Sequence, residues 1–360
     1  MAEQGLADLL SGETVLRRHF EAGLGRLLER GGLNLFVLAM ANACFDTRVW
    51  RSLSGRLDRR FEQLQTGVRQ ALREGCSIDE ADEDLLVFLK LATIGLRNVA
   101  PTGIRHAGPW ELQFNPIRAF RPLRNARRTM NSLRQPFDAQ GFHFNKPFMQ
   151  EEVIASGELL GRKVDLYYNK YPFANLHALL VPGREACQPQ YLDQDSHELA
   201  WQLLETFGPG LPGLRVGYNA MGAFASVNHL HLQLCVRANP LPVEDGRWRH
   251  NGGQEDYPVA CGLFDDAAAA WRFIDGLHRA GQPYNLLYAP GRLYVLQRRY
   301  QGGFDLPVWS NGFSWYELSG AMITCNREQW QVLDANVVAA ALARAALPAE
   351  HGQQSGAGGC

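Results

Sequence analysis

The chain has 360 residues, 46% of them hydrophobic and 20% charged, with a formal net charge of −1 at pH 7. A chain of this length and hydrophobic content buries a large core, which excludes an intrinsically disordered protein and leaves room for two domains or one duplicated domain. The near-zero net charge provides no basic field to attract nucleic acid, so we expect no nucleic-acid partner.

The same overview indicates a cytoplasmic protein. The longest apolar run, residues 33–45, is too short for a bilayer span, so no membrane association is expected. The first residues lead into a polar-apolar helical pattern and not into the charged and apolar regions of a secretory leader. Seven cysteines are scattered without a Cys-x-x-Cys pair. That usage is typical of a reducing compartment and predicts no structural zinc held by such pairs.

Residues 1–99 are predicted to form a helical N-terminal extension. Apolar side chains recur at helical spacing in residues 6–10, 20–28 and 85–91. We expect these helices to pack as a cap or flank on the rest of the chain.

Residues 100–245 combine predicted strands with one long helix. The helix is expected at 195–207, before a turn rich in glycine and proline at 208–213. Strands are expected at 110–114, 164–168, 176–181 and 227–236. This alternation of strands and one long helix indicates an α+β fold.

The most informative stretch is the last of these strands. Successive side chains of a strand point to opposite faces, so His229, His231 and Gln233 would share a polar face while leucines fill the other. A neutral imidazole is a good nucleophile toward phosphorus, and the amide of Gln233 can hold a phosphate oxygen. Two alternatives remain: a metal site with the two histidines as ligands, and buried histidines bonded to backbone groups.

Residues 217–233 run Gly-Tyr-Asn-Ala-Met-Gly-Ala-Phe-Ala-Ser-Val-Asn-His-Leu-His-Leu-Gln. This sequence resembles the active-site signature of the transferase branch of the histidine-triad superfamily. In that branch the motif is His-x-His-x-Gln, with glutamine in place of the third histidine of the hydrolases. Within that branch it is most similar to the GDP-hexose phosphorylases, relatives of diadenosine tetraphosphate phosphorylase and galactose-1-phosphate uridylyltransferase. Residues 133–138, 144–146 and 151–152 resemble the substrate-side segment of the same family.

The resemblance implies a histidine-triad-like fold that is duplicated, with an antiparallel sheet and flanking helices. It implies that His231 is the nucleophile that takes up a nucleoside monophosphate, that His229 orients its surroundings and that Gln233 holds the phosphoryl oxygens. It also implies a set of further residues in or near the phosphate pocket, namely Asn219, Ser226, Asn228, Asn169 and His177.

Lysine is rare in this chain, with four lysines against 32 arginines. Lys146 lies within a segment that carries the resemblance, and we expect it and the neighbouring Asn145 to contact a phosphate or sugar phosphate. Arginines gather at 118–128, where prolines indicate an irregular segment. We expect Arg118 or Arg128 to bind a phosphate or diphosphate, with a solvated charge run as the alternative for the others.

Residues 255–347 look like a degenerate copy of the catalytic half at 100–245. Tyr168-Asn169 and Tyr284-Asn285 each precede a strand, at a constant offset of 116 residues, yet no His-x-His follows in the later half. We expect this half to complete the sheet and close the pocket, and its candidate contacts are Asn285, Arg298 and Arg299. Residues 348–360 are predicted to be a disordered tail.

Residues and resemblance together predict a phosphorylase that cleaves a nucleoside diphosphate hexose, GDP-hexose favoured, with inorganic phosphate through a nucleotidyl-histidine. No cofactor and no metal are expected, because amides, hydroxyls and cations can neutralise the developing charge. The first alternative is a dinucleoside polyphosphate phosphorylase or a nucleotide hydrolase of the same superfamily. More distant alternatives are a metalloenzyme with histidine ligands and an inert nucleotide-binding protein. No residue is diagnostic of the base, the hexose or the oligomeric state.

Overall fold

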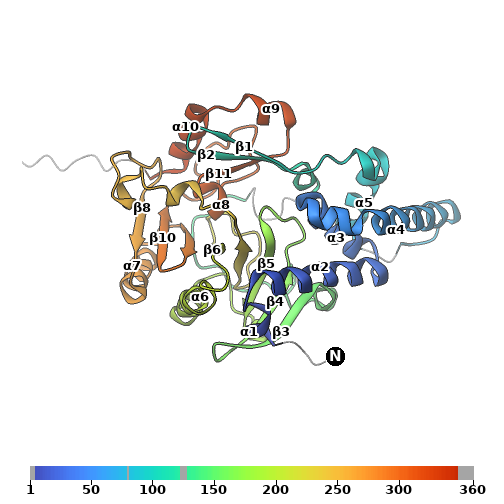
Figure 1. Ribbon diagram of the computed structural model, residues 1–360, viewed down its shortest axis with the longest axis horizontal. Coiled ribbons are helices and arrows are strands. Elements are labelled where there is room, and N and C mark those ends of the chain that lie inside the picture. Colours follow the sequence, from blue (N-terminus) through green and yellow to red (C-terminus); the bar gives the residue numbers. More distant parts are fainter. Residues whose placement is uncertain (1–4, 79–80, 122–127, 348–360) are drawn as a thin grey trace, which may run out of the picture.

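A single eight-stranded sheet forms the centre of the computed structural model, which describes residues 5–78, 81–121 and 128–347 (Figure 1). Its strand order is β3-β4-β5-β7-β6-β9-β10-β8, and every neighbouring pair is antiparallel. The strands are β3 (Val153–Leu159), β4 (Arg162–Tyr168), β5 (Asn175–Pro182), β6 (Leu214–Asn219), β7 (Leu232–Val236), β8 (Cys261–Phe264), β9 (Tyr284–Ala289) and β10 (Arg292–Gln297). The expected α+β architecture with an antiparallel sheet is confirmed.

Two similar units meet in the middle of this sheet. Helix α6 (Gln194–Phe207) precedes the hairpin-like pair β6 and β7, and helix α7 (Ala267–Ala280) precedes β9 and β10. The two helices contact each other, and β6 pairs with β9 so that Asn219 lies opposite Asn285. This topology relates β9 to β6. The 116-residue offset, which pairs Tyr168-Asn169 with Tyr284-Asn285, stays a prediction.

A second, smaller sheet joins the two predicted halves. It has the order β1-β2-β11, from β1 (Gly103–Ala107), β2 (Trp110–Phe114) and β11 (Ala321–Thr324). Strand β11 pairs with β2 in parallel, although more than 200 residues separate them along the chain. Helices α8 (Trp315–Leu318), α9 (Arg327–Val332) and α10 (Ala335–Ala345) surround β11 in sequence. Residues from the later half therefore pack directly beside the earlier half.

The N-terminal part is helical, as predicted from its apolar spacing. It comprises α1 (Leu6–Leu9), α2 (Glu13–Arg30), α3 (Leu33–Phe45), α4 (Thr47–Glu74) and α5 (Asp82–Ile94). The apolar run at 33–45 is α3, a helix buried on almost all sides in the core. In the part of the chain that the structure describes, no helix combines the length and apolar character that crossing a bilayer requires.

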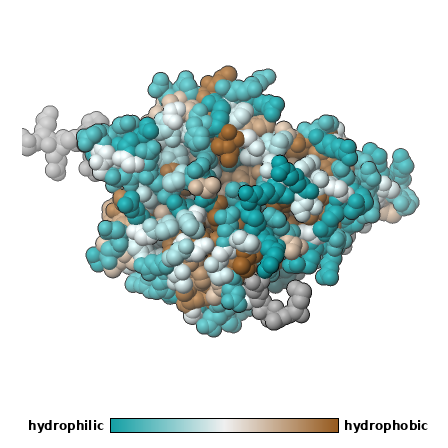
Figure 2. Space-filling view, viewed as in Figure 1, coloured by the Kyte–Doolittle hydropathy of each residue, from teal (hydrophilic) through white to brown (hydrophobic). Residues whose placement is uncertain are grey.

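These helices flank one end of the large sheet (Figure 1). The Tyr168 hydroxyl at the end of β4 donates to the Phe20 carbonyl of α2 at 2.9 Å, and Asn42 of α3 donates to the Asn169 carbonyl at 3.1 Å. The long helix α4 carries a largely hydrophilic outer surface at the right of Figure 2. The N-terminal helices thus hold the turn between β4 and β5, which leads to the cavity described below.

Candidate active site

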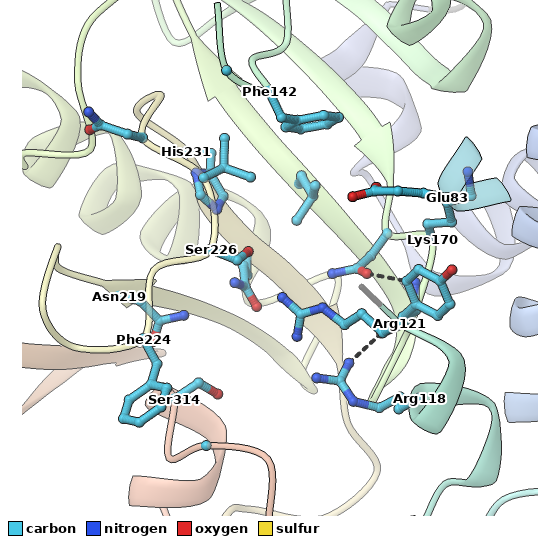
Figure 3. A pocket seen from close by; sticks show the side chains of 18 of the residues that line it. Glu83, Arg118, Arg121, Phe142, Lys170, Asn219, Phe224, Ser226, His231 and Ser314 are labelled. Carbon is cyan, nitrogen blue, oxygen red and sulfur yellow. Dashed lines mark hydrogen bonds between the residues drawn. The ribbon is translucent and has the colours of Figure 1, made fainter. Parts of the chain in front are cut away.

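A cavity of about 920 Å³ opens over the ends of β6 and β7. Its walls come from α5, the segments at 118–121 and 128–149, the turn after β4, residues 219–233 and residues 311–325. Figure 3 shows His231, Ser226 and Asn219 on one side and Arg118, Arg121 and Lys170 on the other. Nine of the predicted site residues line it: His231, Gln233, Asn219, Ser226, Asn228, Lys146, Asn169, Arg118 and Arg128.

His231 presents one ring nitrogen to this cavity. Its Nδ1 lies 2.8 Å from the His229 carbonyl oxygen, which accepts only, so the ring proton lies on Nδ1. The backbone N–H of His231 donates to the Gln190 Oε1 at 2.9 Å, which fixes the main chain at this point. Burial lowers the pKa of His231 to about 4, so the imidazole is neutral at pH 7. The lone pair on Nε2 is therefore available for attack on an electrophile in the cavity.

Gln233 offers an amide donor beside this nitrogen. Its Oε1 accepts from the Trp315 indole Nε1 at 2.9 Å. Because an indole N–H only donates, the oxygen faces Trp315 and the NH2 group faces the cavity that Gln233 lines. This orientation agrees with the predicted use of Gln233 as a donor.

Asn219, at the end of β6, offers a second amide donor. Its Oδ1 accepts from the Trp315 backbone N–H at 2.7 Å and from Asn285 Nδ2 at 2.6 Å. The Nδ2 group of Asn219 is thereby turned toward the cavity. The expected contact residue Asn285 thus supports Asn219 from behind and lies outside the cavity lining.

His229 lies outside the cavity lining, although its ring and that of His231 both pack against Phe144 with ring centroids 5.4 Å apart. Strand β7 begins only at Leu232, so the predicted strand at 227–236 is shorter than expected. Nδ1 accepts from the Phe144 backbone N–H at 3.1 Å, and Nε2 donates to the Arg184 carbonyl at 3.0 Å. Burial is the main cause that lowers its pKa to about 4. Both ring nitrogens are therefore bonded to backbone groups, while the carbonyl of His229 holds His231.

Asn145 and His177 also lie outside the cavity lining. Asn145 donates to the Arg184 carbonyl at 2.9 Å and accepts from the Arg184 guanidinium at 3.1 Å, so it braces a loop and does not face the cavity as predicted. His177 is fully buried, and burial, followed by the charge of Arg118, lowers its pKa to about 3. The Phe173 N–H donates to its Nδ1 at 3.3 Å, which places the ring proton on Nε2, 3.3 Å from Gln233 Oε1.

Two of the lining amides are partly committed to loop contacts. Asn228 accepts from the Gln190 N–H at 3.0 Å and donates to the Pro136 carbonyl at 2.7 Å, so it joins the substrate-side segment to the histidine segment. Asn169 accepts from the Tyr171 N–H at 3.0 Å and lies 3.1 Å from His177. Ser226 lines the cavity between Asn219 and His231 (Figure 3).

Basic side chains occupy the opposite wall. The half-buried Arg118 guanidinium donates to the Tyr171 carbonyl at 2.5 Å and lies 5.1 Å from the Phe173 ring, and desolvation lowers its pKa. Arg128 and Lys146 also line the cavity, and Lys146 Nζ donates to the Ala139 carbonyl at 3.2 Å. Lys170 instead pairs with Asp84 of α5 at 2.5 Å. The cavity is thus lined by an imidazole, amides and cations, with Arg118, Arg121 and Lys170 across from His231 (Figure 3).

Sequence reasoning missed several residues that shape this site. Trp315 and Gln190 hold the amides and the backbone described above, and Ser314 and the start of α5 add to the lining. These contacts join segments up to 96 residues apart in the chain, and no local pattern marks them. Across residues 5–78, 81–121 and 128–347, no three His, Cys, Asp or Glu side chains come together as possible metal ligands.

Comparison with known proteins shows which fold the chain shares and which family its middle part resembles. The overall structure is similar to the crystal structure of yeast Ap4A phosphorylase, with a TM-score of 0.50 and 18% identity over 77% of this chain and 98% of that one. Residues 110–235 match the family described as GDPGP1-like, N-terminal domain. The predicted histidine-triad-like fold is confirmed.

Curated relatives match the same middle part. GDP-D-glucose phosphorylase 1 of Danio rerio is 42% identical over 114 residues, which is 31% of this chain and 32% of that protein. The Homo sapiens protein of the same name is 37% identical over 125 residues, 32% of this chain and 31% of its own length. GDP-L-galactose phosphorylase 1 of Arabidopsis thaliana is 33% identical over 127 residues, 31% of this chain and 28% of its own length. The chain therefore spans about a third of the length of these relatives, and the resemblance to GDP-hexose phosphorylases is confirmed for this part.

Proposed function

We propose that this protein is a nucleotidyltransferase that cleaves a GDP-hexose with inorganic phosphate to give GDP and hexose 1-phosphate. The observation that carries the proposal is the hydrogen bond from His231 Nδ1 to the His229 carbonyl, which leaves Nε2 in the cavity without a hydrogen-bond partner among the described residues. The relatives' names supply the substrate class, since they are GDP-D-glucose and GDP-L-galactose phosphorylases.

The first step is attack by His231 Nε2 on the α-phosphorus of the GDP-hexose. A P–N bond forms, the bridging P–O bond breaks, and hexose 1-phosphate leaves with the electron pair. The imidazole becomes cationic in this step, and the carbonyl of His229 stabilises the N–H that carries the charge. Gln233 and Asn219 donate to the non-bridging oxygens as negative charge grows on them.

In the second step inorganic phosphate attacks the same phosphorus. Its oxygen forms a new P–O bond, the P–N bond to His231 breaks, and GDP leaves while the imidazole returns to its neutral form. We assign Arg118, Arg128 and Lys146 to binding of the phosphate groups, because these cations line the same cavity as the nucleophile. Ser226, Asn228 and Asn169 complete the lining around the substrate.

The domain roles follow from this assignment. Residues 100–245 carry the nucleophile, and residues 255–347 extend the sheet and supply Trp315 and Asn285 behind the two amides. The N-terminal extension, residues 1–99, contributes the start of α5 to the cavity. Residues 348–360, predicted as a tail, lie outside the described residues.

We further propose a cytoplasmic location, since the described cysteines Cys44, Cys76, Cys187, Cys235, Cys261 and Cys325 are all free.

Two alternatives make different predictions at the same site. A dinucleoside polyphosphate phosphorylase would use His231 in the same way and differ only in the leaving group. A metalloenzyme would need His229 and His231 to converge on an ion, whereas both ring nitrogens of His229 are bonded to backbone groups. The geometry therefore favours covalent catalysis by one histidine.

Phosphorolysis of a substrate panel tests the proposal. GDP-D-glucose, GDP-L-galactose, UDP- and ADP-hexoses and diadenosine tetraphosphate are each incubated with and without inorganic phosphate, and products are separated by ion exchange. We expect phosphate-dependent release of GDP from a GDP-hexose, loss of turnover in His231→Ala, and retention in the control His250→Ala, whose ring bonds to the Val243 carbonyl elsewhere. Preferential cleavage of diadenosine tetraphosphate would favour the alternative leaving group.

A further inference from the structure

Trp315, the first residue of α8, touches both amides of the site through two different N–H groups. Its indole Nε1 donates to Gln233 Oε1 at 2.9 Å, and its backbone N donates to Asn219 Oδ1 at 2.7 Å. The side chain is completely buried. A single residue from the later half of the chain thus contacts two donors of the earlier half.

Both contacts fix the direction in which an amide points. An N–H group can only donate, so the carbonyl oxygen of each amide must face Trp315. The two NH2 groups then face the opposite way, toward the cavity that Asn219 and Gln233 line. Among the described residues, neither Asn219 Nδ2 nor Gln233 Nε2 has a hydrogen-bond partner. Both are left for a ligand.

The indole reaches this position because the facing strand carries no side chain there. Gly217 of β6 pairs with Gln233 of β7, and a Cβ on Gly217 would lie 2.1 Å from Trp315 Cε2. The ring therefore packs directly against the backbone of β6, next to Gln233. Any larger residue at Gly217 would displace the ring and lengthen its hydrogen bond to Gln233.

We infer that Trp315 is a positioning residue for phosphoryl transfer: its indole N–H keeps the Gln233 amide turned so that NH2, and not the carbonyl oxygen, meets the phosphoryl group. This inference rests on the proposed function. Without the N–H, the amide is held less firmly and presents its oxygen more often to the negatively charged phosphoryl oxygens, which opposes the transition state. His177 Nε2, 3.3 Å from the same oxygen, remains as a longer-range donor.

The remaining contact from His177 limits how much the rate should fall when the Trp315 N–H is removed. Removal of a whole oxyanion donor lowers kcat by about 10²–10³-fold. Because His177 still holds the oxygen, we expect loss of the Trp315 N–H to lower the rate of guanylyl transfer to His231 by about tenfold. KM should change little, since substrate binding draws on the whole cavity while the amide acts on charge that develops in the transition state.

The test compares Trp315→Phe with the matched control Trp248→Phe. Trp248 is also buried, belongs to the same hydrophobic cluster and donates its indole N–H to the Pro242 carbonyl at 2.6 Å, away from the site. Replacement of Trp315 by benzothienylalanine keeps the ring shape and removes only the N–H, which covers the case in which the phenylalanine variant does not fold. Rates of adduct formation with GDP-hexose are measured by rapid quench, and thermal midpoints are recorded for each protein.

A double-mutant cycle with Gln233→Ala separates positioning from general stability. Trp315 acts through Gln233, so removal of the indole N–H should change the rate less than twofold once the amide is gone. An equal tenfold loss in both backgrounds, or an unchanged rate with Gln233 present, would overturn the inference while adduct formation by the wild type still supports the proposed function. Absence of any adduct in the wild type would instead overturn the proposed function together with this inference.

Discussion

Among single residues, His231 matters most, because its imidazole must be neutral to attack phosphorus. Burial lowers its pKa to about 4, against an ordinary value of 6.5, and no carboxylate contacts the ring to reverse this shift among the described residues. A nucleophile must be unprotonated, so activity is present above the pKa of the folded enzyme and is lost as the pH falls through it.

The pH profile of the first step should show this shift. We expect kcat/KM for adduct formation to stay level from pH 8 to about 5.5 and to fall only below that, as His231 takes up a proton. Circular dichroism at each pH serves as the control for unfolding. Half-maximal activity near pH 6.5 would mean that the nucleophile titrates like an exposed histidine.

The residue scale also shows what a local pattern can predict. His231 and Gln233 were found from the sequence because alternation along β7 and the chemistry of the two side chains agree. Regular alternation was extended to residues 227–231, whereas β7 begins at Leu232 and His229 lies outside the cavity lining. Trp315 was missed because its hydrogen bond to Gln233 joins residues 82 positions apart, and only the folded sheet brings them together.

Among the secondary-structure elements, helix α6 was predicted from its local sequence and is present in the structure. The predicted helix at 195–207 is found at Gln194–Phe207, and the Asp193 side chain caps it by accepting from the Ser196 N–H at 2.8 Å. Such a cap satisfies one of the unpaired N–H groups of the first turn. The two helices α6 and α7 contact each other, so α6 supports the sheet that carries the site.

Loss of this cap should lower stability without removing the site. Asp193→Ala is expected to decrease the free energy of unfolding by about 1 kcal/mol, because the N–H loses its acceptor. Asp193→Asn keeps a side-chain oxygen and should stay close to the wild type. Urea unfolding followed by circular dichroism measures both variants, and an equal loss for Ala and Asn would assign the effect to charge and not to the cap.

At the scale of the whole molecule, buried neutral histidines couple folding to pH. Burial is the main cause that lowers the pKa of His177 to about 3 and those of His229, His231 and His278 to about 4. In the unfolded chain the same rings have a pKa near 6.5, so the unfolded state takes up protons first as the pH falls. Protonation therefore favours unfolding in the range between these values.

The free energy of unfolding should accordingly decrease as the pH falls from about 6.5 to 4. Each such histidine contributes a slope of at most ~1.4 kcal/mol per pH unit in that window. Denaturant titrations at pH 7.5, 6.0 and 5.0 measure the change. A constant free energy of unfolding over this range would contradict the burial of these rings in neutral form.

Features of the whole molecule that depend on contacts between distant segments could not be predicted from the sequence. The antiparallel sheet and the helical N-terminal part were predicted, because strands and helices leave local periodic patterns. The parallel pairing of β11 with β2 and the contribution of α5 to the cavity were not, because both depend on contacts between distant segments. The pairing of β6 with β9 likewise joins segments far apart in the chain.

Intact-protein mass spectrometry after mixing the protein with a GDP-hexose in the absence of phosphate tests directly whether His231 is the nucleophile. We expect a mass increase of one guanosine monophosphate on the wild type, its absence in His231→Ala, and its removal as GDP when inorganic phosphate is added. Phosphate-dependent turnover without any adduct, or an adduct that persists in His231→Ala, would contradict nucleophilic catalysis by His231.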